Sequence, residues 1–221
     1  MNTQKWKKYR LAIFDMDGTL VDSMPYWHRL GRDYLVSRGR TPEDDLEERI
    51  APMTLSESAE YFREHYRLDE TPEEIARGFG ELMEENYRLR VPAKPGAPEF
   101  VRALRDAGIR LSVCSATPVG LVDLMLRRIG IRDCFECVTS CDEAGAGKDR
   151  PDAYLLALSR AGCSPDEAVV FEDAEYAIRT AVKLGLHVAA VYDSSCRMDP
   201  DELRAVTDEY ITGFDELMKE E

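Results

Sequence analysis

The sequence predicts an α/β fold in which a doubly wound parallel sheet, a Rossmann-like core, carries an inserted helical cap domain. Short continuous apolar runs alternate with amphipathic helical patterns, as expected for strands that are buried on both faces of a parallel sheet. One region, from about residue 24 to about residue 90, contains helical signals without a strand-like run. We therefore expect residues 1–22 and 92–221 to form the core and residues 23–91 to form the cap.

Four apolar runs are the expected core strands, and local signals place the helices between them. The runs cover residues 11–14, 111–114, 169–171 and 188–191. The sequence from Ser164 to Glu167 fits a capping box, and Asp199 followed by Pro200 is expected to open the last helix. Glycines stand where helices should end, at positions 108, 130, 162 and 185.

The helical region is expected to be a four-helix-like module inserted directly after the first strand. The segments TPEDDLEERI and TPEEIARGFGELMEENYRLR both begin with Thr-Pro-Glu, a signal for the start of a helix. The region ends at the proline-rich stretch VPAKPGAP, which is typical of a hinge. Such a module suits a lid that closes over a site at the strand ends, and the alternative is a helical extension that only adds stability.

Composition and charge exclude several classes of function. A hydrophobic fraction of 44% in 221 residues is sufficient for a sizeable core. The net charge of −14 argues against nucleic acid or an anionic membrane surface as a partner, because both attract basic proteins. No apolar run approaches the ~20 residues of a membrane span, and the start, MNTQKWKKYR, lacks the apolar stretch of a signal peptide. We therefore expect a cytoplasmic protein, either a monomer or a homodimer.

The cysteines allow two interpretations. Six cysteines in a chain without a secretory signal are expected to be reduced thiols. Cys134, Cys137 and Cys141 are close enough in the sequence to suggest a zinc site, although the sequence offers neither a second close pair nor a nearby histidine. The alternative is a short strand over residues 136–139 that carries small thiols into the core.

Chemically active side chains follow three of the predicted strands at their carboxyl ends. Because the carboxyl ends of parallel strands share one edge of the sheet, we expect these side chains to meet there. Carboxylates at this edge would gather a hard cation such as Mg²⁺, and a lysine and a hydroxyl would neutralise and bind a phosphoryl group. The set comprises Asp15 and Asp17 after the first strand, Ser115 and Thr117 after the second, Glu172 and Asp173 after the strand at 169–171, and Lys148.

The two carboxylates after the first strand need a compensating group. Residues i and i+2 of an extended segment point the same way, so the side chains of Asp15 and Asp17 are expected to leave the strand on one side. Their repulsion would be offset by a cation, a shared proton or a group being transferred. A calcium loop is the main rival for an Asp-x-Asp-Gly stretch, but Leu20 stands where such a loop has glycine, and the flanks are strand-like.

Four motifs, DMDGTLVDS, VCSAT, GKDRPDAY and VVFEDAEYAIRTAVKLG, occur in this order, with the helical insertion after the first. With these motifs the chain resembles the haloacid dehalogenase superfamily, in its branch of β-phosphoglucomutase-like phosphatases, from about residue 11 to about residue 214. The resemblance implies a Mg²⁺-dependent phosphatase that hydrolyses a small phosphorylated metabolite, a phosphate monoester, through an aspartyl-phosphate intermediate.

The resemblance also implies roles for the residues at the strand ends. Asp15 would be the nucleophile that attacks phosphorus, and Asp17 would act as general acid on the leaving group and then as general base for water. Ser115 and Lys148 would bind the phosphoryl oxygens, and Thr117 would contact the substrate. General chemistry agrees, since a carboxylate attacks an anionic phosphate only when a metal and a lysine cancel the repulsion.

A metal site is implied in the same way. Mg²⁺ would be held by Asp173, by the carboxylate of Asp15 and by the backbone carbonyl of Asp17. Glu172 would assist, either directly or through a water molecule.

Departures from the family pattern bear on the choice between its branches. Dehalogenases and phosphonatases lack the second acid, so the presence of Asp17 favours a phosphate ester as the substrate. Sugar phosphomutases have an arginine in a cap stretch that matches APMTLSES here, where the chain has Leu55. Their cap histidine falls at Trp27, with His28 beside it. A sugar phosphomutase is therefore the less expected alternative.

Cap residues that face the core in relatives are candidates for substrate binding. Tyr26, Trp27, His28 and Met53 suggest a partly aromatic pocket, and the alternative is that they form the core of the cap. A wider alternative is a non-catalytic module of the same fold that binds a phosphorylated ligand or a partner protein. A binding module has no use for the second acid, so the intact set of residues favours the enzyme.

Overall fold

The computed structural model describes residues 4–50, 53 and 55–218 of the 221-residue chain, apart from the side chains of residues 55 and 56. The chain folds into two compact units. One comprises the residues up to Asp22 and from Pro92 onward, and the other comprises Ser23–Val91. The candidate residues at the strand ends belong to the first unit, and the cap candidates belong to the second.

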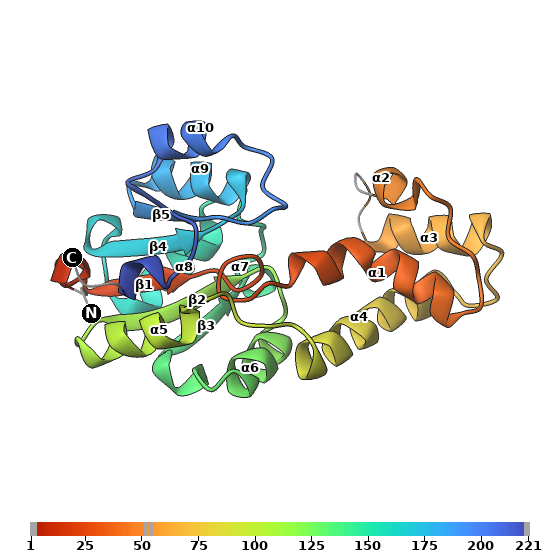
Figure 1. Cartoon of the computed structure of the whole chain (residues 1–221), viewed down its shortest axis with the longest axis horizontal. Coiled ribbons are helices and arrows are strands. Elements are labelled where there is room, and N and C mark those ends of the chain that lie inside the picture. Colours follow the sequence, from red (N-terminus) through yellow and green to blue (C-terminus); the bar gives the residue numbers. More distant parts are fainter. Residues whose placement is uncertain (1–3, 51–52, 54, 219–221) are drawn as a thin grey trace. The chain divides into compact units, whose positions relative to one another are not determined.

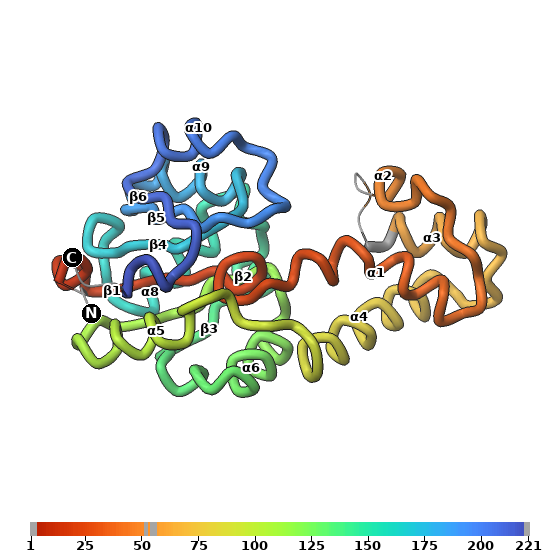
Figure 2. Tube along the Cα trace, in the orientation of Figure 1, coloured from red at the N-terminus to blue at the C-terminus, as the bar shows by residue number. Residues whose placement is uncertain are grey.

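The described part of the first unit is built on a six-stranded sheet with the order β3-β2-β1-β4-β5-β6. Figure 1 labels the strands from β1 to β5, and Figure 2 also labels β6. Each pair of neighbouring strands is parallel. The strands are β1 (Leu11–Phe14), β2 (Arg110–Ser115), β3 (Cys137–Ser140), β4 (Ala168–Glu172), β5 (His187–Val191) and β6 (Glu209–Ile211). The predicted fold class, a doubly wound parallel sheet of the Rossmann-like type, is confirmed.

The four predicted core strands are present, and each agrees with the prediction to within one residue at either end. β6 was not expected. Its three residues, Glu-Tyr-Ile, do not form an apolar run. Only Ile211 is buried, and the other two residues are half-buried, as expected at the edge of a sheet. The strand pairs with β5 at the edge of the sheet, where Figure 2 shows the two side by side.

The chain changes sides at β1. From β1 it passes to β2 and β3 on one side of the sheet, and it then returns to β4, which pairs with the other side of β1. β1 and β4 therefore flank a topological switch point, where ligands bind in open parallel sheets. Asp15 directly follows β1, and Glu172 is the last residue of β4.

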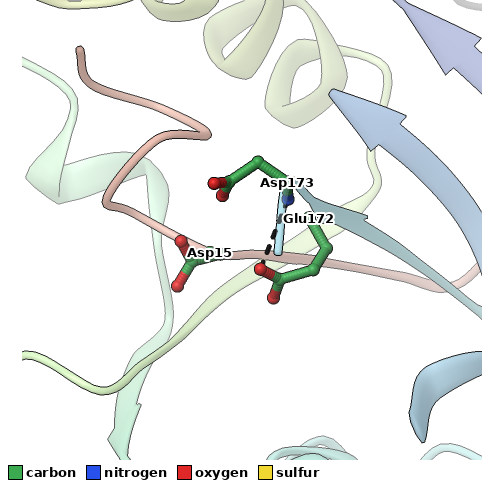
Figure 3. A group of neighbouring side chains, drawn as sticks. All are labelled: Asp15, Glu172 and Asp173. Atoms are coloured by element: carbon green, nitrogen blue, oxygen red, sulfur yellow. Dashed lines mark hydrogen bonds between the residues drawn. The ribbon is translucent and has the colours of Figure 1, made fainter. Parts of the chain in front are cut away.

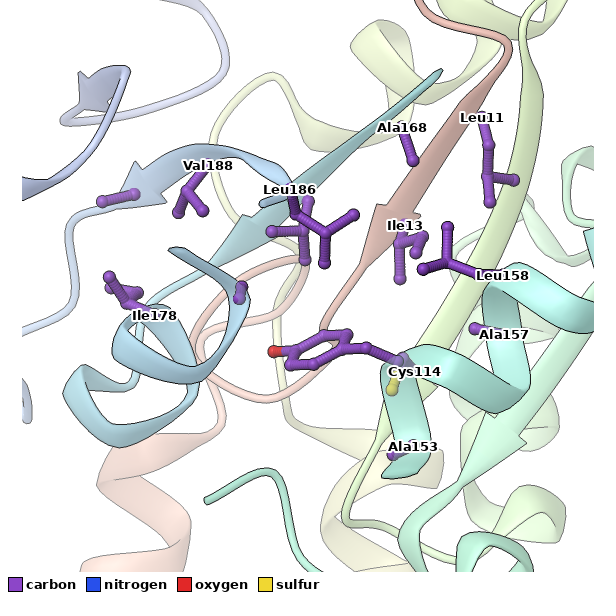
Figure 4. Close-up of a cluster of buried hydrophobic side chains, with 14 of the residues drawn as sticks. Leu11, Ile13, Cys114, Ala153, Ala157, Leu158, Ala168, Ile178, Leu186 and Val188 are labelled. Atoms are coloured by element: carbon purple, nitrogen blue, oxygen red, sulfur yellow. The ribbon is translucent and has the colours of Figure 1, made fainter. Parts of the chain in front are cut away.

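Helices and a hydrophobic cluster cover the sheet. Leu11 and Ile13 of β1 belong to a buried cluster that also contains Ala153, Ala157 and Leu158 of the helix α8 (Figure 4). The burial of these apolar side chains fixes α8 against the sheet. The helices of the first unit are α5 (Ala97–Asp106), α6 (Val119–Arg128), α7 (Cys141–Ala144), α8 (Asp152–Ala161), α9 (Glu175–Leu184) and α10 (Pro200–Val206). Single 3₁₀ turns cover Gln4–Trp6, Arg132–Cys134, Pro165–Glu167 and Glu216–Met218.

Local signals act at the predicted helix ends, with one difference. Gly162 ends α8 and Gly185 ends α9 in the left-handed conformation, and Asp199 caps α10 by accepting a hydrogen bond from the Asp201 N–H at 2.8 Å. Ser164 and Glu167 form the expected capping box, but only one 3₁₀ turn follows, because β4 begins at Ala168.

The second unit is helical. Its helices are α1 (Met24–Ser37), α2 (Leu46–Ile50), α3 (Leu55–His65) and α4 (Pro72–Leu89). Aromatic side chains of three helices, Tyr34, Phe62 and Phe79, pack against one another in its core. The second Thr-Pro-Glu segment opens α4, as predicted, and the structure adds a capping box there. In the first such segment the helix begins only at Leu46, which is the first buried residue there.

Among the described residues, none of the helices combines the length and the apolar character that a membrane crossing requires.

Candidate active site

Three carboxylates meet at the carboxyl ends of β1 and β4. They belong to Asp15, Glu172 and Asp173, all of which are buried, and one oxygen from each lies within 4.8 Å of the others (Figure 3). The backbone N–H of Asp15 donates to the carbonyl of Phe171 at 2.9 Å. The pairing of β1 with β4 thus continues beyond β1 and places Asp15 beside the end of β4.

Lys148 compensates part of this charge. Its side chain is only 3% exposed, and Nζ donates to Asp15 Oδ1 at 2.5 Å and to Glu172 Oε2 at 2.7 Å. The Cys114 carbonyl accepts a third, longer hydrogen bond at 3.4 Å. The lysine, which lies between α7 and α8, therefore links the carboxyl ends of β1, β2 and β4.

Burial and mutual repulsion perturb these groups. Burial raises the pKa of Asp15 well above its usual range, Lys148 opposes this shift, and Glu172 and Asp173 add to it. Burial, followed by the charge of Glu172, raises the pKa of Asp173 to about 7. Burial alone would lower the pKa of Lys148, but Asp15 and Glu172 raise it well above its usual value, so the lysine stays protonated. With all three carboxylates ionised, their negative charge exceeds the charge of the single ammonium group, and a bound cation would offset the excess.

The loop after β1 holds Asp173 in place. The Thr19 hydroxyl donates to Asp173 Oδ1 at 2.7 Å, and both groups are buried. Gly18 has a φ of +82°, and a Cβ at this position would lie 2.7 Å from Asp173 Cγ. Glycine is thus required both by the backbone conformation and by the close approach of the carboxylate. The sequence prediction missed Thr19, although it lies within the first motif, because its partner is distant in the sequence.

Asp17 makes different contacts from Asp15. Its Oδ2 accepts a hydrogen bond from Thr117 Oγ1 at 2.6 Å, and its carboxylate is not one of the three that cluster at the ends of β1 and β4. The backbone N–H of Thr117 donates to Ser115 Oγ at 3.2 Å. The structure therefore joins Asp17, Ser115 and Thr117 at the end of β2.

Tyr154 is a second neighbour of the cluster that the sequence prediction missed. Its hydroxyl donates to Glu172 Oε2 at 2.9 Å, and its side chain is fully buried. The backbone N–H groups of Asp173 and Ala174 donate to the other oxygen, Oε1, both at 3.3 Å. The motif GKDRPDAY places this tyrosine shortly after Lys148, but the helical pattern alone gives it no role beyond the core.

The cap candidates lie in the second unit. Trp27 is half-buried, and its Nε1 donates to the Tyr87 hydroxyl at 3.2 Å. The Tyr26 hydroxyl donates to the carbonyl of Arg90 at 3.3 Å, and His28 is exposed. These contacts are compatible with both interpretations of the cap residues, so the aromatic pocket stays a prediction.

The stretch that bears on a phosphomutase is only partly described. Met53 is half-buried, whereas residues 51, 52 and 54 and the side chain of Leu55 lie outside the described residues. The inference from Leu55 therefore rests on the sequence.

The cysteine cluster contains the expected short strand. β3 contains Cys137 and is shifted by one residue from the predicted range, while Cys134 and Cys141 flank it and are buried. In the part of the chain that the structure describes, the carboxylates of Asp15, Glu172 and Asp173 are the His, Cys, Asp or Glu side chains close enough together to hold a metal ion.

The chain is similar to known proteins of one family. A family model of haloacid dehalogenase-like hydrolases matches residues 9–185. The chain is 30% identical over 183 residues to the phosphorylated carbohydrates phosphatase of Thermotoga maritima, which covers 79% of this chain and 81% of that protein. It is 29% identical over 181 residues to hexitol phosphatase A of Escherichia coli, which covers 81% of each chain.

Solved structures show the same fold. A Thermotoga maritima protein described provisionally as a β-phosphoglucomutase superposes with a TM-score of 0.80 at 26% identity, over 91% of this chain and 94% of that one. CbbY from Rhodobacter sphaeroides, solved in complex with phosphate, gives a TM-score of 0.77 at 24% identity, over 95% of this chain and 96% of that one.

Proposed function

The chain belongs to the haloacid dehalogenase-like hydrolases, as its motifs predicted, and from this premise we propose that it is a Mg²⁺-dependent phosphatase that forms an aspartyl-phosphate intermediate. Its curated relatives are phosphatases, which confirms the prediction of an enzyme that hydrolyses phosphate monoesters. The observation that best supports the proposed mechanism is the buried cluster in which Asp15 meets Lys148 and Asp173.

The cluster suits a magnesium ion. Mg²⁺ prefers oxygen ligands, and the three buried carboxylates bring their oxygens within 4.8 Å of one another. We propose Asp15, Asp173 and the backbone carbonyl of Asp17 as ligands, with Glu172 assisting. The bound ion would screen the charge of the phosphate group and so permit attack by a carboxylate.

In the proposed first step, Asp15 attacks the phosphorus of the ester. A bond forms between a carboxylate oxygen and phosphorus while the bond from phosphorus to the leaving oxygen breaks. Lys148, which donates to Asp15 at 2.5 Å, would neutralise and orient the phosphoryl oxygens together with the Ser115 hydroxyl. Asp17 would give its proton to the leaving oxygen, because an unprotonated alkoxide is a poor leaving group.

In the proposed second step, water hydrolyses the aspartyl-phosphate. Asp17, now ionised, would take a proton from the water molecule as its oxygen attacks phosphorus. The bond from phosphorus to Asp15 then breaks and inorganic phosphate leaves. The hydrogen bond of 2.6 Å from Thr117 to Asp17 would keep this carboxylate in one orientation while it acts as the base.

We propose a phosphorylated carbohydrate as the substrate. Two relatives are named for phosphorylated carbohydrates and for hexitol phosphates, and a third, from Escherichia coli, is named for fructose 1-phosphate. The net charge of −14 supports a small ester over a nucleic acid or a membrane surface.

The cap and the surroundings of the enzyme complete the proposal. We propose that residues 23–91 act as a lid in which Trp27 and His28 contact the substrate. A cytoplasmic location, and a monomer or a homodimer as the working form, stay predictions from the sequence.

A panel of phosphate esters tests the proposed function. The protein would be assayed on p-nitrophenyl phosphate, hexitol phosphates, fructose 1-phosphate and nucleotides, in Mg²⁺ and in EDTA. We expect turnover in Mg²⁺, loss of turnover in EDTA, recovery on addition of Mg²⁺, and a preference for carbohydrate phosphates over nucleotides.

Other results of the same panel would point elsewhere. Full activity after exhaustive dialysis against EDTA would refute the metal site. No turnover of any ester would favour a non-catalytic binding module, and interconversion of sugar phosphates without release of inorganic phosphate would identify a phosphomutase.

A further inference from the structure

Glu172 is held on both of its carboxylate oxygens by the protein itself. Oε1 accepts hydrogen bonds from the backbone N–H groups of Asp173 and Ala174 at 3.3 Å. Oε2 accepts from Lys148 Nζ at 2.7 Å and from the Tyr154 hydroxyl at 2.9 Å. The side chain is only 1% exposed, so bulk water cannot replace a lost donor.

Lys148 and Tyr154 reach the same oxygen from one short segment. Lys148 precedes α8, and Tyr154 lies in the first turn of that helix. Tyr154 is fully buried within the hydrophobic cluster that α8 forms with the sheet, so its ring has a fixed position. A buried tyrosine hydroxyl usually needs a polar partner, and Glu172 supplies it.

The ammonium group of Lys148 is shared between acceptors. Its hydrogen bonds go to Asp15, to Glu172 and to the carbonyl of Cys114. Asp15 and Glu172 accept hydrogen bonds from the same ammonium group. The strength of the hydrogen bond from Lys148 to Glu172 therefore affects the hydrogen bonds that Lys148 can donate to Asp15 and to any group bound beside it. The Tyr154 hydroxyl is a second donor to Glu172 Oε2, and it weakens the attraction of this oxygen for the ammonium group.

We propose that Tyr154 is a positioning residue of the active site: its hydroxyl fixes the Glu172 carboxylate and, through it, the Lys148 ammonium group that serves the phosphoryl group. This proposal rests on the proposed function, because it takes Lys148 as a phosphate-binding residue. Without the hydroxyl, Glu172 Oε2 has one donor fewer, and the lysine is drawn toward Glu172 and away from the phosphoryl group.

The test compares Tyr154→Phe with two control variants of the full chain. Tyr34→Phe removes a tyrosine hydroxyl that donates to Glu70 at 3.0 Å in the second unit. Leu158→Ala weakens the hydrophobic cluster around Tyr154 without removing a donor from Glu172. Each protein is assayed for kcat and KM with p-nitrophenyl phosphate in Mg²⁺, for the affinity of inorganic phosphate by calorimetry in Mg²⁺, and for its melting temperature.

Tyr154→Phe is expected to lower kcat about tenfold and to weaken phosphate binding about fivefold, the size of effect that one hydrogen bond to a charged group supports. Its melting temperature should also fall, because the buried Glu172 carboxylate loses a donor that water cannot replace, but by no more than that of Leu158→Ala. Both controls should keep the parental kcat and phosphate affinity, although Leu158→Ala should melt at a lower temperature. In a Glu172→Gln background, Tyr154→Phe should cause little further loss, because both changes act on the same carboxylate.

Parental kcat and parental phosphate affinity in Tyr154→Phe would overturn the proposal, and so would additive losses in the double variant. The proposed function fails separately: a parent protein that binds phosphate but turns over no ester is not a phosphatase, while the binding comparison still decides the role of Tyr154. A parent protein that binds no phosphate in Mg²⁺ would overturn both.

Discussion

At the scale of single residues, the site combines the negative charge of three carboxylates with the positive charge of one ammonium group. Lys148 is buried and pairs with both Asp15 and Glu172. The same side chain therefore offsets the charge of these acids in the fold and, in the proposed function, binds the phosphoryl group.

Lys148→Met should abolish turnover and lower the free energy of unfolding by about 3–5 kcal/mol without metal, because it leaves buried carboxylates without their cation. Lys94→Met is the matched control, since Lys94 forms a largely buried ion pair with Asp193 at 2.7 Å and has no proposed role in the reaction. The control should lose stability but keep its turnover. Urea unfolding and p-nitrophenyl phosphate assays measure both quantities, and equal loss of turnover in the two variants would contradict the role of Lys148.

Gly18→Ala should impair both the stability of the fold and the metal site, whereas backbone strain alone would affect only stability. Gly18 and Gly108 have similar φ values of +82° and +86°, but a Cβ at Gly18 would collide with Asp173, whereas a Cβ at Gly108 would meet open space. Gly108→Ala should lower the free energy of unfolding by about 1–2 kcal/mol and leave turnover unchanged. Gly18→Ala should in addition raise the Mg²⁺ concentration needed for half-maximal turnover, and an unchanged Mg²⁺ requirement would argue against this contact.

Sequence analysis identified the residues that stand next to a strand end, because a strand end is a local feature. Asp15, Glu172 and Asp173 all adjoin apolar runs and do cluster in the structure. Thr19 and Tyr154 escaped because their partners, Asp173 and Glu172, are distant in the sequence. A hydroxyl in a loop or at the start of a helix is commonly a cap or a core group, so its residue type alone does not reveal such a contact.

At the scale of elements, the strand order places the site. β1 and β4 are buried throughout, which made them visible as apolar runs, and their pairing brings Asp15 to Glu172 and Asp173. The edge strand β6 has no apolar run and was missed. Hydrophobic periodicity therefore predicts the centre of this sheet better than its edge.

An ion pair connects the residues that follow β5 to Lys94. Lys94 Nζ donates to Asp193 Oδ2 at 2.7 Å and to the carbonyl of Tyr192 at 2.9 Å. Ser195 donates to Asp193 Oδ1 through its hydroxyl at 2.6 Å and through its N–H at 2.8 Å. Burial opposes the ionisation of Asp193, but the hydrogen bonds from Lys94 and Ser195 outweigh it, so the pKa of Asp193 lies below its usual value.

Asp193→Asn should therefore reduce stability mainly at neutral pH. A carboxyl group with a lower pKa in the folded state stabilises the fold above its unfolded pKa of about 4, and it loses this contribution as the pH falls through the folded value. The difference in unfolding free energy between the parent and Asp193→Asn should be constant from about pH 8 to about pH 5 and shrink below about pH 4. Urea unfolding across this range measures it, and a difference that grows in acid would contradict the ion pair.

At the scale of the whole molecule, the two units have different tasks in the proposed function. The first unit supplies the carboxylates and Lys148. Because the chain carries a net charge of −14, the positive charge that binds an anionic ester must come from groups within the site, such as Lys148. The second unit, which contains Trp27 and His28, would select among esters.

Trp27→Ala should change selectivity among phosphate esters more than it changes stability. Tyr87→Phe is the control, because it removes the hydroxyl that accepts the indole N–H at 3.2 Å but keeps the indole. The ratio of kcat/KM for a carbohydrate phosphate to that for p-nitrophenyl phosphate should shift in Trp27→Ala and stay near the parental value in Tyr87→Phe. A uniform loss on every ester, together with a lower melting temperature, would place Trp27 in the core of the cap.

The central claim is that Asp15 forms a covalent phosphoenzyme which Asp17 then helps to hydrolyse, and trapping that intermediate tests it most directly. The Asp17→Asn protein would be mixed with p-nitrophenyl phosphate in Mg²⁺, quenched in acid within milliseconds to seconds, and analysed by peptide mass spectrometry. The leaving group of p-nitrophenyl phosphate needs little protonation, so the first step should still proceed. The attack of water in the second step lacks its general base, whose contribution is typically worth ~10²–10⁴-fold in rate. A phosphoryl group should therefore accumulate on Asp15 in Asp17→Asn and be absent from Asp15→Asn. Rapid turnover by Asp17→Asn without a phosphoryl group on Asp15, or a phosphoryl group that persists in Asp15→Asn, would contradict the account.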